Sequence, residues 1–127
     1  VKKHMFGDYI DLLKTLNPSK DLSKCDRDSF NNQINDIYCI MDNDNIVATA
    51  KLHVEDKLVS KLGHIEDVVV NPKYRSLGFG KKIVKHVIQQ AKEKGCYKTV
   101  LYCKQELYDF YTKCGLSCSG LQFEIRF

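Results

Sequence analysis

Long apolar runs, tryptophan and low-complexity stretches are missing from the 127-residue sequence, which has only two prolines. No apolar run approaches the roughly 20 residues that cross a bilayer, so we expect no membrane span. No apolar core follows Val1–His4, so we expect no export signal and a cytoplasmic protein. The length predicts a single domain over residues 1–127, and the ordinary composition excludes a disordered chain.

A strong excess of one charge is also missing, because 20 Lys and Arg residues stand against 16 Asp and Glu residues. Both signs are scattered along the chain, whereas nucleic-acid binders usually gather their basic residues on one face, so we expect no nucleic-acid partner. The six cysteines form no CxxC pair, and no H-x-x-x-H pair completes a ligand set with Cys114 and Cys118. We therefore expect reduced, mostly packed thiols and no metal site.

Hydrophobic periodicity predicts an α/β (α+β) domain built on a mixed sheet. Helices are predicted from apolar residues at helical spacing: Phe6–Leu16, Asp26 or Asp28 to Ile34, Gly78–Lys94 and Leu107–Lys113. Strands are predicted from alternating or β-branched runs: Ile37–Met41, Ile46–Val54, His64–Val70, Lys98–Cys103 and Leu121–Phe127. Asp42–Asn45 is typical of a hairpin turn, and Gly95 of a helix end.

The segment Arg75–Gly80, which reads Arg-Ser-Leu-Gly-Phe-Gly, joins a predicted strand to the longest predicted helix. Its glycines allow close backbone approach to an anion, and the first N–H groups of the helix and its dipole favour negative charge there. An ordinary glycine-containing turn has the same short pattern, so the pattern alone leaves both interpretations open. No GxxxxGK[ST] is present, and no GxGxxG follows a first strand, which disfavours a P-loop and a dinucleotide site.

The pattern R-x-x-G-x-G between a strand and a long helix resembles the acetyl-CoA pyrophosphate loop of the GNAT acyltransferase superfamily. Three more segments resemble its eukaryotic glucosamine-6-phosphate N-acetyltransferases: Gly63–Val70, Gly95–Lys98 and Phe110–Leu116. The resemblance runs from about Ala48 to the C-terminus. It implies a GNAT fold, with a mostly antiparallel central sheet flanked by helices and a splayed strand pair that binds acetyl-CoA.

The same resemblance implies an activity and a partner. The activity is transfer of acetyl from acetyl-CoA directly to the 2-amino group of glucosamine 6-phosphate, a step of UDP-N-acetylglucosamine biosynthesis. No acyl-enzyme is implied, so Cys103 and Cys114 are expected to be packing residues. The implied partner is a second copy in an intertwined homodimer with shared active sites, to which Leu121–Phe127 would cross.

The resemblance also assigns roles to single residues. Contacts with the sugar and its amine are assigned to Glu66 and Asp67, and Glu66 is assigned the deprotonation of the amine through water. The two residues are neighbours on a predicted strand, so their side chains are expected on opposite faces. Structural salt bridges are the alternative interpretation of the two carboxylates. Tyr111 is assigned the protonation of the CoA thiolate, and a packed aromatic residue is the alternative. Acetyl-CoA contacts are assigned to Val68, Val69, Val70, Arg75, Ser76, Leu77, Gly78, Phe79, Gly80, Lys81 and Tyr102.

Contacts with the sugar phosphate are assigned to Lys57, Ser60, Arg126 and Ser19. The sequence departs from the family pattern in the short connection from Lys57 to Gly63, in Leu107 where an Asn is usual, and in Tyr102 where an acid is usual. Tyr102 is therefore expected to help hold the amine through its backbone carbonyl, a role that does not depend on its side chain. An acetyltransferase for a polyamine or a protein amine is one alternative function, and a silent acyl-CoA-binding module is another. The cations Lys57 and Arg126 favour an anionic substrate.

Overall fold

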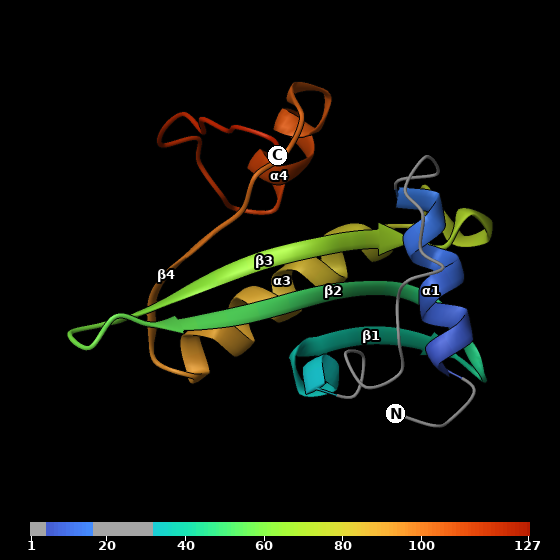
Figure 1. Cartoon of the computed structure of the whole chain (residues 1–127). Coiled ribbons are helices and arrows are strands. Elements are labelled where there is room, and N and C mark those ends of the chain that lie inside the picture. Colours follow the sequence, from blue (N-terminus) through green and yellow to red (C-terminus); the bar gives the residue numbers. More distant parts are fainter. Residues whose placement is uncertain (1–4, 17–31) are drawn as a thin grey trace.

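A computed structural model describes residues 5–16 and 32–127, which include one mixed four-stranded sheet (Figure 1). Its strands, in spatial order, are β1 (Ile37–Asp42), β2 (Asn45–Asp56), β3 (Lys61–Val70) and β4 (Cys96–Val100). The pairs β1–β2 and β2–β3 are antiparallel, and β3–β4 is parallel. The predicted mixed, mostly antiparallel sheet is therefore confirmed.

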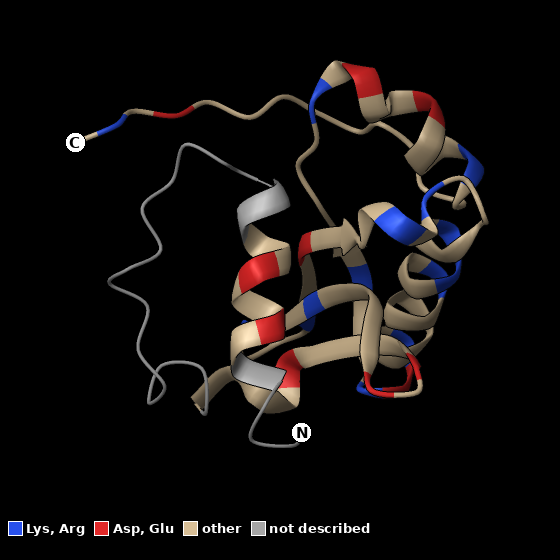
Figure 2. Cartoon of the chain, turned by 90° about the vertical axis from the view of Figure 1, so that its right-hand side faces the viewer, with Lys and Arg blue, Asp and Glu red and all other residues tan. Residues whose placement is uncertain are grey.

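Helices cover both faces of the sheet. The α-helices that lie wholly within the described residues are α1 (Met5–Leu16), α3 (Phe79–Glu93) and α4 (Tyr108–Lys113). Short 3-10 turns are η1 (Ile34–Asp36), η2 (Pro72–Tyr74) and η3 (Gln105–Leu107). Helices α1 and α3 lie on opposite faces of the sheet, as Figure 2 shows. Most of the predicted helix from Asp26 or Asp28 to Ile34 lies outside the described residues.

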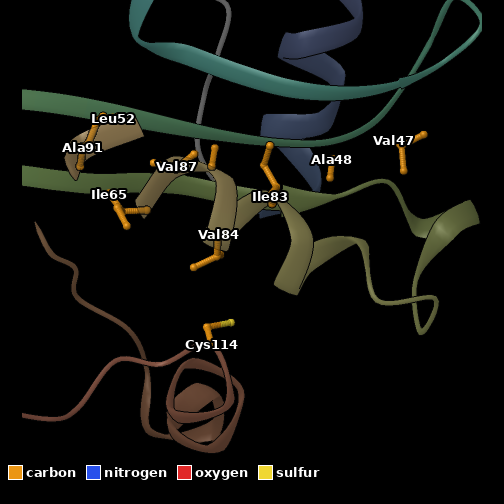
Figure 3. Close-up of a cluster of buried hydrophobic side chains, with 10 residues drawn as sticks. Val47, Ala48, Leu52, Ile65, Ile83, Val84, Val87, Ala91 and Cys114 are labelled. Carbon is orange, nitrogen blue, oxygen red and sulfur yellow. The ribbon is translucent and has the colours of Figure 1, made fainter. Parts of the chain in front are cut away.

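In the part of the chain that the structure describes, two separate clusters of buried side chains hold these layers together. The larger lies between the sheet and α3 and consists of Val47, Ala48, Ala50, Leu52, Ile65, Ile83, Val84, Val87, Ala91 and Cys114 (Figure 3). The smaller lies on the α1 side and consists of Tyr9, Leu12, Ile46 and Val69. Each fully buried Val, Leu or Ile contributes about 1.5–3 kcal/mol. Cys114 is 4% exposed in the larger cluster, which confirms its predicted packing role.

Two turn predictions are confirmed by backbone angles. Asn43 has φ +54° in the β1–β2 turn, where Asn tolerates the left-handed region. Gly95 has φ +87° directly after the last turn of α3, where a residue with a Cβ would be strained. The turn and helix end therefore follow from local sequence.

The predicted strand Leu121–Phe127 is wrong for the single chain. Residues 116–127 form no regular element, and Leu121 and Phe123 are 89% and 90% exposed. Alternating apolar residues form a strand only when a neighbouring strand pairs with their backbone and covers their apolar face. No helix in residues 5–16 and 32–127 is both long and apolar enough to cross a membrane.

Candidate functional site

Strands β3 and β4 pair over only part of β3. Residues Lys61–His64 lie beside Cys96–Val100, and from Leu101 onward the chain leaves the sheet toward α4 while β3 continues (Figure 1). The predicted strand Lys98–Cys103 therefore ends early, at Val100. Among the described residues, the β4-facing edge of Ile65–Val70 has no strand beside it. An extended ligand can pair with such an edge as an added strand does.

The closed end of this splay depends on a glycine. A Cβ on Gly63 would lie 3.1 Å from Thr99 Cγ2 of β4 and 3.3 Å from Ala91 Cβ of α3. The missing side chain thus lets β3, β4 and α3 approach closely where the strands pair. The sequence predicted no such role for Gly63.

A β-bulge interrupts β3 along its open part. Thr49 faces Val69 and Lys51 faces Glu66, so Asp67 and Val68 together lie opposite the single residue between Thr49 and Lys51. Asp67 has φ +53°, a left-handed conformation that Asp tolerates better than most residues. Bulges of this kind redirect side chains and free backbone groups from the ladder.

The bulge changes which face successive side chains of β3 occupy. Ile65 before the bulge and Val68 after it both pack on the α3 side, whereas Val69 packs on the α1 side. In a regular strand Ile65 and Val68 would lie on opposite faces. The strict alternation assumed from the sequence therefore fails here.

The carboxylates of Glu66 and Asp67 are both exposed, and both lie near α1. Burial raises the pKa of the Tyr9 hydroxyl on α1, and the charges of Asp67 and Glu66 raise it further. The charges of both carboxylates reach Tyr9, at the point where the bulge at Asp67 and Val68 interrupts the regular alternation of β3. They form one acidic site at the bulge, beside Tyr9.

Sequence reasoning missed two neighbours of this acidic site, Tyr9 and Lys51. Lys51 Nζ lies 3.9 Å from Glu66 Oε2, and the Lys51 side chain is only 17% exposed. The same Nζ donates a hydrogen bond to Gln33 Oε1. The alternation of β2 assigns Lys51 to a face of the sheet, but only the register identifies Glu66 as its neighbour.

The segment Arg75–Gly80 is held in place at its base. Asn71 donates from its backbone N–H to Val47 O at 2.7 Å and from Nδ2 to Ile46 O at 3.1 Å. Tyr74 donates its hydroxyl hydrogen to Asp42 Oδ2 at 2.8 Å. These bonds attach the connection to β2 and to the β1–β2 turn, so the start of α3 has a fixed position.

Beyond these anchors the backbone bends sharply. Ser76 and Gly78 have φ values of +66° and +86°. The first N–H groups of α3 have no partner within the helix, and Gly78 supplies no side-chain cap. Arg75 and Lys81 are exposed beside this turn, and Arg75 Nε donates to Val70 O at 3.4 Å. The arrangement has the features of an anion site at a helix N-terminus.

The two glycines of this segment serve different physical needs. Gly78 has open space around it but needs its positive φ. Gly80 is buried, and a Cβ there would lie 3.1 Å from Phe110 Cζ and 3.3 Å from Val70 Cγ2. Gly80 therefore lets α3 pack closely on β3 and α4, a role that the short glycine pattern did not predict.

Gly80→Ala is expected to destabilise the fold by about 1–3 kcal/mol, because overpacking displaces Phe110 or Val70. The matched control is Gly7→Ala in α1, where a Cβ would meet nothing within 4 Å. That change is expected to stabilise the fold by about 0.5–1 kcal/mol, since Ala favours a helix over Gly. Thermal unfolding measures both, and an unchanged or raised Tm for Gly80→Ala would contradict the packing role.

The other wall of the splay is formed by residues 101–104 and α4. Tyr102 is 68% exposed on this wall. Tyr111 is half-buried and packs against the α3-side cluster, with its ring edge-on to Phe110 at 4.9 Å between centroids. Burial and the nearby thiols of Cys103 and Cys114 raise the pKa of Tyr111 to about 12. Its hydroxyl is therefore a protonated donor at neutral pH.

Three predicted residues, Lys57, Ser60 and Arg126, are not brought to the bulge within one chain. Lys57 and Ser60 lie in the β2–β3 turn, where Lys57 N donates to Ser60 O at 2.8 Å. The length of β3 between this turn and Asp67 is on the order of 20 Å. Arg126 lies in the exposed tail, with Nε 3.5 Å from Glu124 Oε1. Ser19 lies outside the described residues.

Comparison with known proteins identifies the family. The family model for the acetyltransferase (GNAT) family matches residues 7–116. The chain belongs to the GNAT acetyltransferase family. The splay, the bulge and the turn at Arg75–Gly80 lie along a single strand and the helix that follows it.

Relatives within the GNAT family bear a common name. A probable glucosamine 6-phosphate N-acetyltransferase from Oryza sativa is 45% identical over 85 residues, which are 65% of this chain and 51% of that protein. The Candida albicans glucosamine 6-phosphate N-acetyltransferase is 34% identical over 129 residues, 94% of this chain and 87% of that protein. The chain spans about half to two thirds of the plant relatives it matches, with 51%, 65% and 52% covered.

A solved GNAT structure gives the same fold. The crystal structure of glucosamine-6-phosphate N-acetyltransferase from Arabidopsis thaliana superposes with a TM-score of 0.83 at 32% identity, covering 97% of this chain and 91% of that one. Leu107, where the family usually has Asn, precedes α4 as a cap without a side-chain hydrogen bond. In residues 5–16 and 32–127, no group of three or more His, Cys, Asp or Glu side chains could hold a metal ion.

Proposed function

We propose that this chain transfers the acetyl group of acetyl-CoA to the 2-amino group of glucosamine 6-phosphate, giving N-acetylglucosamine 6-phosphate and CoA. The observation that carries the proposal is the bulge at Asp67, which sets two carboxylates beside the open edge of β3. A thioester lying along that edge would meet free backbone N–H donors on one side. On the other side it would meet the two carboxylates, which would receive the substrate amine. The names of the sequence relatives support the choice of substrate.

Acetyl-CoA is proposed to follow β3 and end at the start of α3. Its pantetheine amides would pair with the open edge at Val68–Val70, as an added strand does. Its pyrophosphate would accept hydrogen bonds from the backbone of residues 76–81, beside Arg75 and Lys81. The positive φ values of Ser76 and Gly78 and the unpaired N–H groups of α3 support this placement.

The amine is proposed to attack the thioester carbonyl directly. Glu66, whose side chain is 47% exposed, would take the amine proton through water, while Asp67 and the carbonyl of Tyr102 hold the sugar and its amine. A backbone N–H of Val68 or Val69 would donate to the thioester oxygen as negative charge develops. A C–N bond forms, the C–S bond breaks, and the amine loses one proton while the thiolate gains a donor.

Tyr111 is the proposed donor to the departing thiolate. A phenol with a pKa of about 12 stays protonated near neutral pH. Thiols have pKa values of about 8.5, so complete proton transfer from this phenol to the thiolate would be thermodynamically unfavourable. The proposed role is therefore a hydrogen bond that stabilises the thiolate, with the final proton supplied by solvent.

The phosphate end of the site is proposed to need a second copy of the chain. Lys57, Ser60 and Arg126 are candidate phosphate ligands, yet in one chain they lie on the hairpin turn and on the tail, away from the bulge. Leu58 and Val59 on that turn are 98% and 97% exposed, and the tail alternates exposed apolar residues. An intertwined homodimer would cover these side chains and bring the cations to the partner's bulge. Cytoplasmic location and a place in UDP-N-acetylglucosamine synthesis remain predictions from the sequence.

Thiol release from acetyl-CoA tests the proposal, with glucosamine 6-phosphate, glucosamine and spermidine compared as acceptors. Two or more charge-assisted bonds to the phosphate predict a kcat/KM at least about 100-fold higher for glucosamine 6-phosphate than for glucosamine. Spermidine, a cation, is expected to give no turnover above hydrolysis. Equal rates for the sugar and its phosphate would contradict the phosphate site, and faster turnover of spermidine would favour a polyamine acetyltransferase.

A further inference from the structure

A partly buried lysine lies beside the acidic site. Lys51 is directly opposite Glu66 in the β2–β3 ladder, with Nζ 3.9 Å from Glu66 Oε2. The Lys51 side chain is 17% exposed and that of Glu66 is 47% exposed. The Lys51 side chain is partly buried along its aliphatic stem, and its ammonium has two polar partners, Glu66 and Gln33.

The surroundings of Lys51 restrict it further. Nζ donates to the amide oxygen of Gln33, which directly precedes η1. The neighbour across β1 is Ile37, an apolar residue that offers the ammonium no side-chain partner. The Lys51 ammonium therefore lies between the neutral amide oxygen of Gln33 and the carboxylate of Glu66. These contacts connect the residue before η1 with the strand at the bulge.

We infer that Lys51 is a positioning residue that holds the Glu66 carboxylate where the substrate amine is deprotonated. This inference rests on the proposed acetyl transfer. A half-exposed glutamate on an interrupted strand samples several rotamers unless something restrains it. An ion pair with a lysine fixed by Gln33 supplies that restraint. The Lys51 ammonium is turned toward Glu66 of β3 and toward Gln33.

Lys51→Met tests the inference through a double-mutant cycle with Glu66→Gln. In the wild-type background Lys51→Met is expected to lower kcat about 10-fold, because the carboxylate loses its fixed position. In the Glu66→Gln background the same change is expected to have almost no further effect, since Lys51 acts through Glu66. An equal loss in both backgrounds would show a general structural role and overturn the inference.

Two further variants control for charge and folding. Lys51→Arg keeps a cation and is expected to retain most of the wild-type kcat. Lys92→Met removes a charge from the exposed face of α3 and is expected to leave kcat unchanged. Should Lys51→Met fold poorly, Lys51→Gln keeps a polar group for Gln33 and takes its place in the cycle. Loss of kcat in Lys51→Arg equal to that in Lys51→Met would count against the ion pair.

A readout without turnover separates this inference from the proposed function. Three-bond couplings in the unliganded protein report the χ1 rotamers of Glu66. One dominant rotamer is expected in the wild type, and averaging among rotamers is expected in Lys51→Met. Identical couplings in the wild type and in Lys51→Met would overturn the inference, whichever amine is the acceptor. If the couplings differ as expected but glucosamine 6-phosphate is not turned over, only the proposed substrate is overturned.

Discussion

Tyr111→Phe is expected to lower kcat about 100-fold while leaving acetyl-CoA affinity nearly unchanged, because it removes one donor that acts on charge formed in the transition state. Phe keeps the ring that packs on the α3-side cluster and against Phe110, so the fold should not change. Single-turnover kinetics and acetyl-CoA titration measure the two quantities separately. The matched control is Tyr108→Phe, which removes the same hydroxyl from an exposed position of α4 and is expected to leave kcat unchanged.

The pH dependence gives a second check on Tyr111. Because the native pKa of Tyr111 is raised to about 12, its hydroxyl stays protonated through the range in which an ordinary tyrosine ionises. An ordinary tyrosine ionises near about pH 10. Ionisation of Tyr111 should therefore cause no loss of kcat in that pH range. The pH profiles of the wild type and of Tyr111→Phe are expected to have the same shape there. Equal kcat for Tyr111→Phe and wild type would remove Tyr111 from the chemistry.

Mixing two impaired variants is expected to restore activity at a glucosamine 6-phosphate concentration well below the KM of Arg126→Ala. If one site takes Tyr111 from one chain and Arg126 from its partner, Tyr111→Phe and Arg126→Ala chains form mixed dimers with one intact site. Random re-association of equal amounts then gives about one quarter of wild-type activity, since half of the dimers are mixed. Alone, Arg126→Ala is expected to raise KM for glucosamine 6-phosphate about 10–100-fold, the loss expected for a charged hydrogen bond.

The controls for this mixing experiment are built into the tail. Glu124→Gln removes the neighbour of Arg126 without removing the cation and is expected to keep KM within about twofold. Turnover of unphosphorylated glucosamine should not change in Arg126→Ala, because that acceptor has no phosphate to lose. No recovery on mixing, with mixed dimers demonstrated by mass, would place Tyr111 and Arg126 in the same chain's site and contradict the exchange of tails.

Local sequence predicted the elements that are stabilised locally. The apolar stripe that includes Ile83, Val84 and Val87 predicted α3, and Gly95 predicted its end, because periodicity and left-handed caps depend on neighbouring residues. The predicted strand Leu121–Phe127 failed for the opposite reason. Its alternation is real, but a strand requires a partner, and no strand in residues 5–16 and 32–127 pairs with it. The early end of β4 likewise depends on where α4 packs, which no local pattern records.

The candidate site was predicted in its residue types more than in its geometry. Glu66 and Asp67 were identified from a motif, but the bulge that places them together arises from the β2–β3 register. Lys51 and Tyr9 were missed because each meets the carboxylates across the sheet or from a helix far away in sequence. Gly80 was assigned to anion binding, and the structure adds that its missing side chain lets α3 pack on Phe110 and Val70.

A competition between two acceptors tests the proposed acetyl transfer most directly. Carbonyl-labelled acetyl-CoA is supplied with equal concentrations of glucosamine 6-phosphate and spermidine, and NMR identifies the labelled amides. The product ratio equals the ratio of the two kcat/KM values. We expect essentially all label on the 2-amino group of the sugar phosphate. Label mainly on spermidine, or CoA release without a labelled sugar amide, would contradict the proposed substrate and reaction.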